Sequence, residues 1–261
     1  ADPNISFEES FQRQKTSDYH NPLLFNLLLK EFLYSTKYDP NYARFLPFIF
    51  GSISIFFFGI LSYQVKKDNS FLLTTLLASL SIYLIKYSQE VRPYSLLLML
   101  SIINISLYYL ILKKTHRKII YNYILLFSFI IISVLNYSTN PFSLIIFFSQ
   151  ITHSFINFFY FKKKDKTFFF LLIPIVSLYL LFNYDYLIHQ ISFNSYQLSA
   201  DIVNVIDGLY FPRFFGSKIM GYFYLTLLIF LIIKSRKIFL ENNNYLFFLI
   251  LIFFSYLIPL L

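Results

Sequence analysis

The chain has 261 residues, of which 57% are hydrophobic and 13% are charged, about half the charged share of an ordinary soluble domain. A soluble core of this size could not bury so much apolar surface, so lipid is expected to be the solvent for much of the chain. The absence of cysteine excludes disulfides, thiolate metal sites and a cysteine nucleophile. A net charge of +9 would suggest nucleic acid in a soluble protein, but in a membrane protein its distribution predicts topology.

Both ends of the chain suggest a fragment. Residues 1–21 are polar and contain no apolar signal-peptide core, while residues 247–261 end inside an apolar run. We therefore expect truncation at both ends, with a first membrane crossing upstream. The run Pro22 to Tyr34 is short and carries Lys30 and Glu31, which predicts an interfacial helix rather than a crossing.

Eight further apolar runs approach the ~20 residues that a helix needs to cross the hydrocarbon core. No internal repeat and no Gly/Ser-rich or Pro-rich linker divides the chain. We predict an all-α fold, a polytopic transmembrane helical bundle in one domain (1–261), with an outer loop and interfacial helix over 1–44 and spans and loops over 45–261. The predicted spans are 45–63, 70–86, 93–112, 119–137, 141–161, 168–186, 216–233 and 245–261.

Basic residues are concentrated in alternate loops between these spans. One set of loops holds thirteen of the 22 basic residues and three of the 13 acidic residues. The positive-inside rule places these loops in the cytoplasm, so we expect an integral membrane protein whose functional groups face outward. The basic residues are Lys66, Lys67, Lys113, Lys114, Arg117, Lys118, Lys162, Lys163, Lys164, Lys166, Lys234, Arg236 and Lys237.

The first outer candidate is Asp18-Tyr19-His20-Asn21-Pro22, directly before the interfacial helix. Asp18 fits a helix cap, because a carboxylate there accepts hydrogen bonds from the first backbone N–H groups. Alternatively Asp18 and His20 form a site, since a histidine beside a carboxylate at the membrane surface can bind a phosphate or a metal.

The second candidate is the tight outer turn Ser88-Gln89-Glu90-Val91-Arg92-Pro93-Tyr94. Ionisable groups this close to a membrane are costly and often functional. The alternative is that Lys86 and Glu90 pair at spacing i, i+4 while Arg92 extends to lipid headgroups. The residues alone do not decide between these two interpretations.

A third outer loop, Asp185 to Phe215, carries Arg213 among aromatic residues. An interfacial anchor is favoured there over a pocket for a lipid-linked phosphate. His116 and His153 have no carboxylate at ligand spacing and are expected to be bystanders. No HExxH, GxSxG or P-loop motif is present.

Read together, the two outer motifs resemble a known family. Tyr87 to Tyr94, followed by Ser95-Leu96-Leu97-Leu98, resembles the YSQEARPYSLLL signature of the GT-C membrane glycosyltransferases, specifically the bacterial relatives of dolichyl-phosphate-mannose protein mannosyltransferases. Asp18-x-His20-x-Pro22-Leu23 is similar to that family's D-x-HPPL segment. Arg44-Phe45-Leu46-Pro47 stands where the family has R-L-P before its next span.

The likeness extends from Asp18 to about Gln150, where Tyr137 to Gln150 is similar to a further stretch of the family. Asn21 replaces the first proline of HPP, and Val91 replaces a usual alanine. Thr139-Asn140 stands where Thr-His is common, which removes a polar contact of the family.

The resemblance implies a GT-C-like bundle that transfers a sugar from a polyprenyl-phosphate donor to a lipid, glycan or protein acceptor on the extracytoplasmic face. Such a reaction needs a carboxylate for the acceptor proton and cations for the leaving phosphate. Glu90 and Asp18 are then the catalytic candidates of this chain, while the family's principal acid is expected upstream. The expected substrate-binding residues are His20, Arg92, Gln89, Tyr94 and Arg213.

No cofactor is required by this chemistry, although a divalent ion between Asp18 and His20 remains an alternative. The expected partners are the sugar donor, the acceptor and the lipid bilayer, without nucleic acid. A transporter or flippase of a lipid-linked solute is a rival. Such proteins usually have ionisable or helix-breaking residues near mid-membrane, whereas the predicted spans here carry almost no charge and Pro174 is their clearest central breaker. The sequence therefore favours the enzyme over the transporter. A non-catalytic or polymerase subunit of surface polysaccharide assembly is the other rival.

Overall fold

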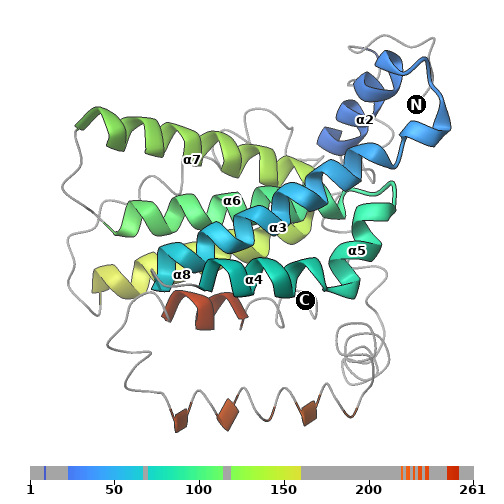
Figure 1. The fold of residues 1–261 in the computed structure, drawn as a ribbon. Coiled ribbons are helices and arrows are strands. Elements are labelled where there is room, and N and C mark those ends of the chain that lie inside the picture. Colours follow the sequence, from blue (N-terminus) through green and yellow to red (C-terminus); the bar gives the residue numbers. More distant parts are fainter. Residues whose placement is uncertain are drawn as a thin grey trace, which may run out of the picture.

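The computed structural model describes residues 9, 23–66, 70–113, 119–159 and 246–252, with isolated positions between 219 and 234. Every element in the described ranges is a helix, and the helices lie side by side in one bundle (Figure 1). The described elements are α2 (Leu23–Ser35), η1 (Pro40–Tyr42), α3 (Phe45–Lys66), α4 (Ser70–Ser79), α5 (Ile82–Gln89), α6 (Tyr94–Leu112), α7 (Ile119–Thr139), η2 (Pro141–Ser143) and α8 (Leu144–Phe159).

Three described helices, α3, α6 and α7, are long and apolar enough to cross a membrane. The bent pair α4 and α5 adds a fourth if it is counted as one span. An all-helical fold with several helices long and apolar enough to cross a membrane is thus confirmed for the described residues, whereas eight spans remain a prediction. Helix α8 has only 16 residues, the run 168–186 lies outside the described residues, and the last two runs are described only in part.

The predicted span 70–86 is not one straight helix. Its two halves, α4 and α5, meet at an angle of 57°, although the sequence has no proline or glycine there. Near the break, the Ser79 hydroxyl donates to the Leu76 carbonyl at 2.8 Å and the Ser81 N–H donates to the Ala78 carbonyl at 3.1 Å. These bonds reach back only three residues, so they tighten the last turn of α4 and end it.

Glycine on α3 determines how closely α4 and α5 approach it. A Cβ on Gly51 would lie 2.6 Å from the Cβ of Ser88, and a Cβ on Gly59 would meet Thr75 and, at 2.8 Å, the ring of Phe71. Both glycines are buried. A side chain at Gly51 would press on Ser88 next to the α5 backbone, and one at Gly59 would displace the side chains of Thr75 and Phe71. Glycine at these positions therefore lets the helices pack closely.

Helix α6 is the centre of the bundle, with α3 on one side and α7 on the other (Figure 1). Nine of its residues are buried. Two hydrophobic clusters form around it: one joins Leu61, Ile105, Tyr108, Phe129, Ile146 and Phe247, and the other joins Phe25, Leu96 and Leu100. The rows of exposed leucines on α4, by contrast, are suited to contact with lipid tails.

The basic ends of α3 and α6 lie together. The Lys113 ammonium donates to the Gln64 carbonyl at 3.2 Å, which brings the C-terminal ends of these two parallel helices to one end of the bundle. Helices α2 and α5 lie at the other end (Figure 1). Lys66 and Lys113 therefore lie at a common end of the bundle, as the charge pattern predicts, while the assignment of that end to the cytoplasm remains a prediction.

Replacing Gly51 by leucine is expected to lower the free energy of unfolding by about 1–3 kcal/mol, because the new side chain must displace Ser88 and the α5 backbone. Denaturant unfolding in detergent, followed by circular dichroism, measures this change. The control is Ser52→Leu, since Ser52 is exposed on the same helix. Equal destabilisation by both substitutions would contradict the close-packing role of Gly51.

Candidate functional site

The candidate site is the turn between α5 and α6. Helix α5 ends at Gln89, and Glu90 follows in an extended conformation with φ −88° and ψ 134°. The Arg92 N–H donates to the Glu90 carbonyl at 2.8 Å, which closes a three-residue turn. Pro93 then precedes α6, because its fixed φ suits a helix start and its missing N–H is not needed there.

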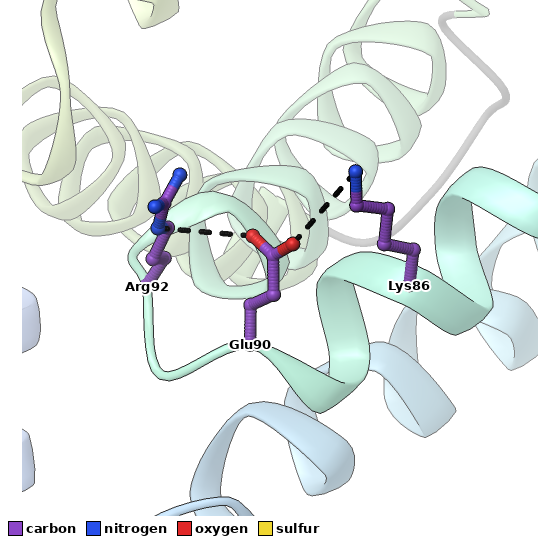
Figure 2. A network of polar contacts seen from close by, with 3 residues as sticks. All are labelled: Lys86, Glu90 and Arg92. Atoms are coloured by element: carbon purple, nitrogen blue, oxygen red, sulfur yellow. Dashed lines mark ion pairs between the residues drawn. The ribbon is translucent and has the colours of Figure 1, made fainter.

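This turn brings three charged side chains together (Figure 2). The Lys86 Nζ lies 3.9 Å from Glu90 Oε1, and the Arg92 Nε lies 3.7 Å from Glu90 Oε2. The i, i+4 pairing of Lys86 with Glu90 that the spacing suggests is therefore confirmed. The pairing does not exclude a functional role, because the Lys86 and Arg92 side chains are 63% and 64% exposed.

The carboxylate of Glu90 is held by charge rather than by hydrogen bonds. Both ion-pair distances exceed the usual hydrogen-bond range, and Oε2 is buried without a hydrogen-bond partner. The side chain as a whole is 30% exposed. The arrangement therefore leaves acceptor capacity on the carboxylate for a hydroxyl and N–H groups on the two cations for an anion.

Aromatic packing stabilises the turn from both helices. The Tyr87 ring on α5 and the Tyr94 ring on α6 have centroids 5.1 Å apart at an interplanar angle of 60°, a favourable tilted arrangement. Ser88 packs against Gly51 of α3, which leaves Gln89 exposed at the end of α5. The structure thus places Gln89, Glu90, Arg92 and Tyr94 of the predicted site on one turn.

Helix α2 approaches the same region. Phe25 is only 2% exposed and forms one hydrophobic cluster with Leu96 and Leu100 of α6. The helix that follows the Asp18-x-His20 motif therefore packs beside the helix that follows the Glu90 motif. Asp18 and His20 themselves, like Arg213, lie outside the described residues.

The described residues contain no group of three His, Cys, Asp or Glu side chains that could hold a metal ion. The alternative of a divalent ion at Asp18 and His20 falls outside the described part of the chain. The expectation about cofactors thus remains a prediction.

Sequence reasoning missed a buried polar network in the middle of α6, α7 and α8. His153, expected to be a bystander, is 0% exposed and makes a 2.8 Å contact with the Tyr108 hydroxyl. A signal was present in the sequence: Gln150, His153, Ser154 and Asn157 follow the spacing i, i+3, i+4, i+7 of one helix face.

No protein-family model, curated protein or solved structure matches this chain. The likeness to GT-C enzymes thus rests on the motifs themselves, and membership of that family remains a prediction.

The Glu90→Gln substitution is expected to change the free energy of unfolding by less than about 1 kcal/mol, because ion pairs with such exposed partners contribute little to stability. Thermal unfolding in detergent tests this, with Glu31→Gln as the control for loss of one exposed carboxylate on α2. A loss of several kcal/mol for Glu90→Gln alone would show that the cluster is structural.

Proposed function

We propose that this protein is a membrane glycosyltransferase. It transfers a hexosyl or pentosyl group from a polyprenyl-phosphate-linked donor to a lipid, glycan or protein acceptor on the outer face of a bacterial inner membrane. The observation that carries the proposal is the cluster of Lys86, Glu90 and Arg92, which offers a carboxylate and two exposed cations at one membrane-proximal turn. The resemblance of this turn to the GT-C signature supports the same reaction.

In the proposed reaction, the acceptor hydroxyl attacks the anomeric carbon of the donor sugar, and the bond from that carbon to the phosphate oxygen breaks. A carboxylate takes the hydroxyl proton, and Glu90 and Asp18 are the proposed acidic groups. The departing polyprenyl phosphate gains negative charge, which Arg92, Lys86 and His20 stabilise. Gln89, Tyr94 and Arg213 are proposed to contact the substrates.

The surface of α5 supports this position for the donor. Leu80, Ile82 and Ile85, at the break and along α5, are 66%, 78% and 44% exposed, and the same helix leads directly to Lys86 and Glu90. An isoprenoid tail can lie on these apolar side chains while its phosphate meets the cations at the end of the helix.

A transporter of a lipid-linked solute is the second candidate. Two observations favour it: the break between α4 and α5, and the buried polar side chains in α6, α7 and α8. Interrupted helices and intramembrane polar groups are typical of transporter binding sites.

Transfer assays with purified, intact protein and radiolabelled polyprenyl-phosphate sugars test the proposal. Glu90→Gln and His20→Ala are each expected to lower transfer by about 100-fold or more, the usual cost of losing an acid–base or charge-stabilising group. Glu31→Gln, which lies outside the proposed site, is the matched control and is expected to keep its activity.

Unchanged turnover in both variants would refute the assigned roles. Movement of the donor across proteoliposome membranes, with no sugar transferred to any acceptor, would instead support the transporter.

A further inference from the structure

The first turn of α6, directly after the candidate site, offers backbone hydrogen-bond donors. An α-helix has no internal acceptor for its first N–H groups, and the first backbone bond here runs from the Leu97 N–H to the Pro93 carbonyl at 2.8 Å. No side chain caps the helix, and no acceptor is found among the described residues for the N–H groups of Tyr94, Ser95 and Leu96. These donors and the helix dipole together favour an anion at this end of α6.

A buried hydroxyl lies on the same turn. Ser95 is 2% exposed, and its Oγ has no hydrogen-bond partner. Serines farther inside the helices, such as Ser54 and Ser133, donate to the carbonyl four residues earlier. The residue four positions before Ser95 is Val91, which lies in the turn and not in a helix, so this local acceptor is not in place. Since the Cα–Cβ bond of a helical residue tilts toward the N-terminus of its helix, the Ser95 side chain is directed toward the N–H groups of the first turn.

Packing alone does not require a hydroxyl at this position. A buried hydroxyl without a hydrogen bond is unfavourable, and alanine would occupy nearly the same space as Ser95. A ligand oxygen at the N-terminus of α6 could accept from this hydroxyl and from the backbone N–H groups together. A phosphate fits such a set of donors, because it presents several strong acceptor oxygens and is the anion that helix N-termini commonly bind.

Charge at the neighbouring turn also favours an anion. The nearest carboxylate in the sequence, that of Glu90, lies between Lys86 and Arg92, so one acidic and two basic groups give the turn a net charge of +1. Glu90 meets Arg92 through Nε, and the two terminal guanidinium nitrogens point away from the carboxylate (Figure 2). These nitrogens can donate to two oxygens of one phosphate. The turn is open to an approaching ligand, because Val91 and Arg92 are exposed.

We propose that the first turn of α6 binds the phosphate group of a lipid-linked phosphate, with Ser95 as a phosphate-binding residue. The Ser95 hydroxyl and the backbone N–H groups donate to the phosphate oxygens, and Arg92 supplies positive charge. The exposed apolar side chains of Ile82 and Ile85 on α5 are available to the hydrocarbon tail, which favours a lipid over free phosphate. The inference rests on the proposed function only for the identity of this lipid as the sugar donor.

Calorimetric titration of the intact protein in detergent with farnesyl phosphate tests the proposal without any transfer of sugar. Ser95→Ala is expected to weaken binding about tenfold or more, the size of one hydrogen bond to a charged group. Because the hydroxyl is unpaired without a ligand, the same substitution should not lower the midpoint of thermal unfolding.

Ser106→Ala is the matched control. Ser106 lies on the same helix, is 4% exposed and also has a hydroxyl without a hydrogen-bond partner, but it lies about three turns farther along α6. This substitution should leave the affinity for farnesyl phosphate unchanged. Equal affinities of the Ser95→Ala protein and the Ser106→Ala protein would overturn the role of Ser95.

Two further titrations identify the part of the ligand that binds. Farnesol has the same tail without the phosphate, and binding of farnesol as tight as that of farnesyl phosphate would overturn a phosphate site. Inorganic phosphate is expected to bind more weakly than farnesyl phosphate, and equal binding would overturn the lipid-linked source.

The fate of this inference is separate from that of the proposed enzyme. Binding of farnesyl phosphate that depends on Ser95, in a protein that transfers sugar from no donor, would support the phosphate site and contradict the glycosyltransferase. Sugar transfer with binding that does not depend on Ser95 would support the glycosyltransferase and overturn the phosphate site.

Discussion

The structure depends on one constraint: inside a membrane, polar groups find no water and must pair within the protein. Serine and threonine hydroxyls meet this requirement by bonding to backbone carbonyls of their own helix. Ser54, Ser133 and Thr139 each donate to the carbonyl one turn earlier, at 2.7 to 2.8 Å. Amide side chains cannot satisfy all their groups in this way, so those of Asn104 and Gln150 bond to neighbouring helices instead. These hydrogen bonds therefore determine which faces of α6, α7 and α8 pack against one another.

The candidate site takes its geometry from the same packing. Helix α6 is held at mid-length by the polar network and near its start by the cluster of Phe25, Leu96 and Leu100. Helix α5 is seated on α3 where Gly51 admits Ser88. The turn between these two helices therefore has a defined position, with Glu90 between Lys86 and Arg92. The hydrogen bonds and packing in the interior therefore help to position the charged side chains of the turn.

Local patterns in the sequence predict the local features of this fold. The apolar runs at 45–63, 93–112 and 119–137 correspond to α3, α6 and α7, and the helix expected at Pro22 to Tyr34 is α2. The pairing of Lys86 with Glu90 follows from the geometry of a single helix turn. These predictions succeed because the interactions that determine them lie within a few residues of one another.

Features that depend on contacts between distant segments could not be predicted in the same way. No proline or glycine in the sequence indicates the bend between α4 and α5. The bend occurs where α5 packs on Gly51 of α3. His153 meets Tyr108 across 45 positions of the chain, so a search for nearby carboxylates could not identify its surroundings. The relation of Asp18 and His20 to the Glu90 turn is a prediction of the same long-range kind.

The proposed site requires the bent pair α4–α5 to cross the membrane, so that the Glu90 turn lies on the face opposite Lys66 and Lys113. Because the chain has no cysteine, a single cysteine can be introduced by Lys66→Cys, at the end of α3 before this pair, or by Gln89→Cys, at the end of α5. Both positions are exposed, and each can be labelled with a membrane-impermeant maleimide in intact spheroplasts. We expect the Gln89→Cys protein to be labelled from outside and the Lys66→Cys protein only after permeabilisation. Labelling of both proteins from the same side would show that α4–α5 is a re-entrant loop and not a membrane crossing.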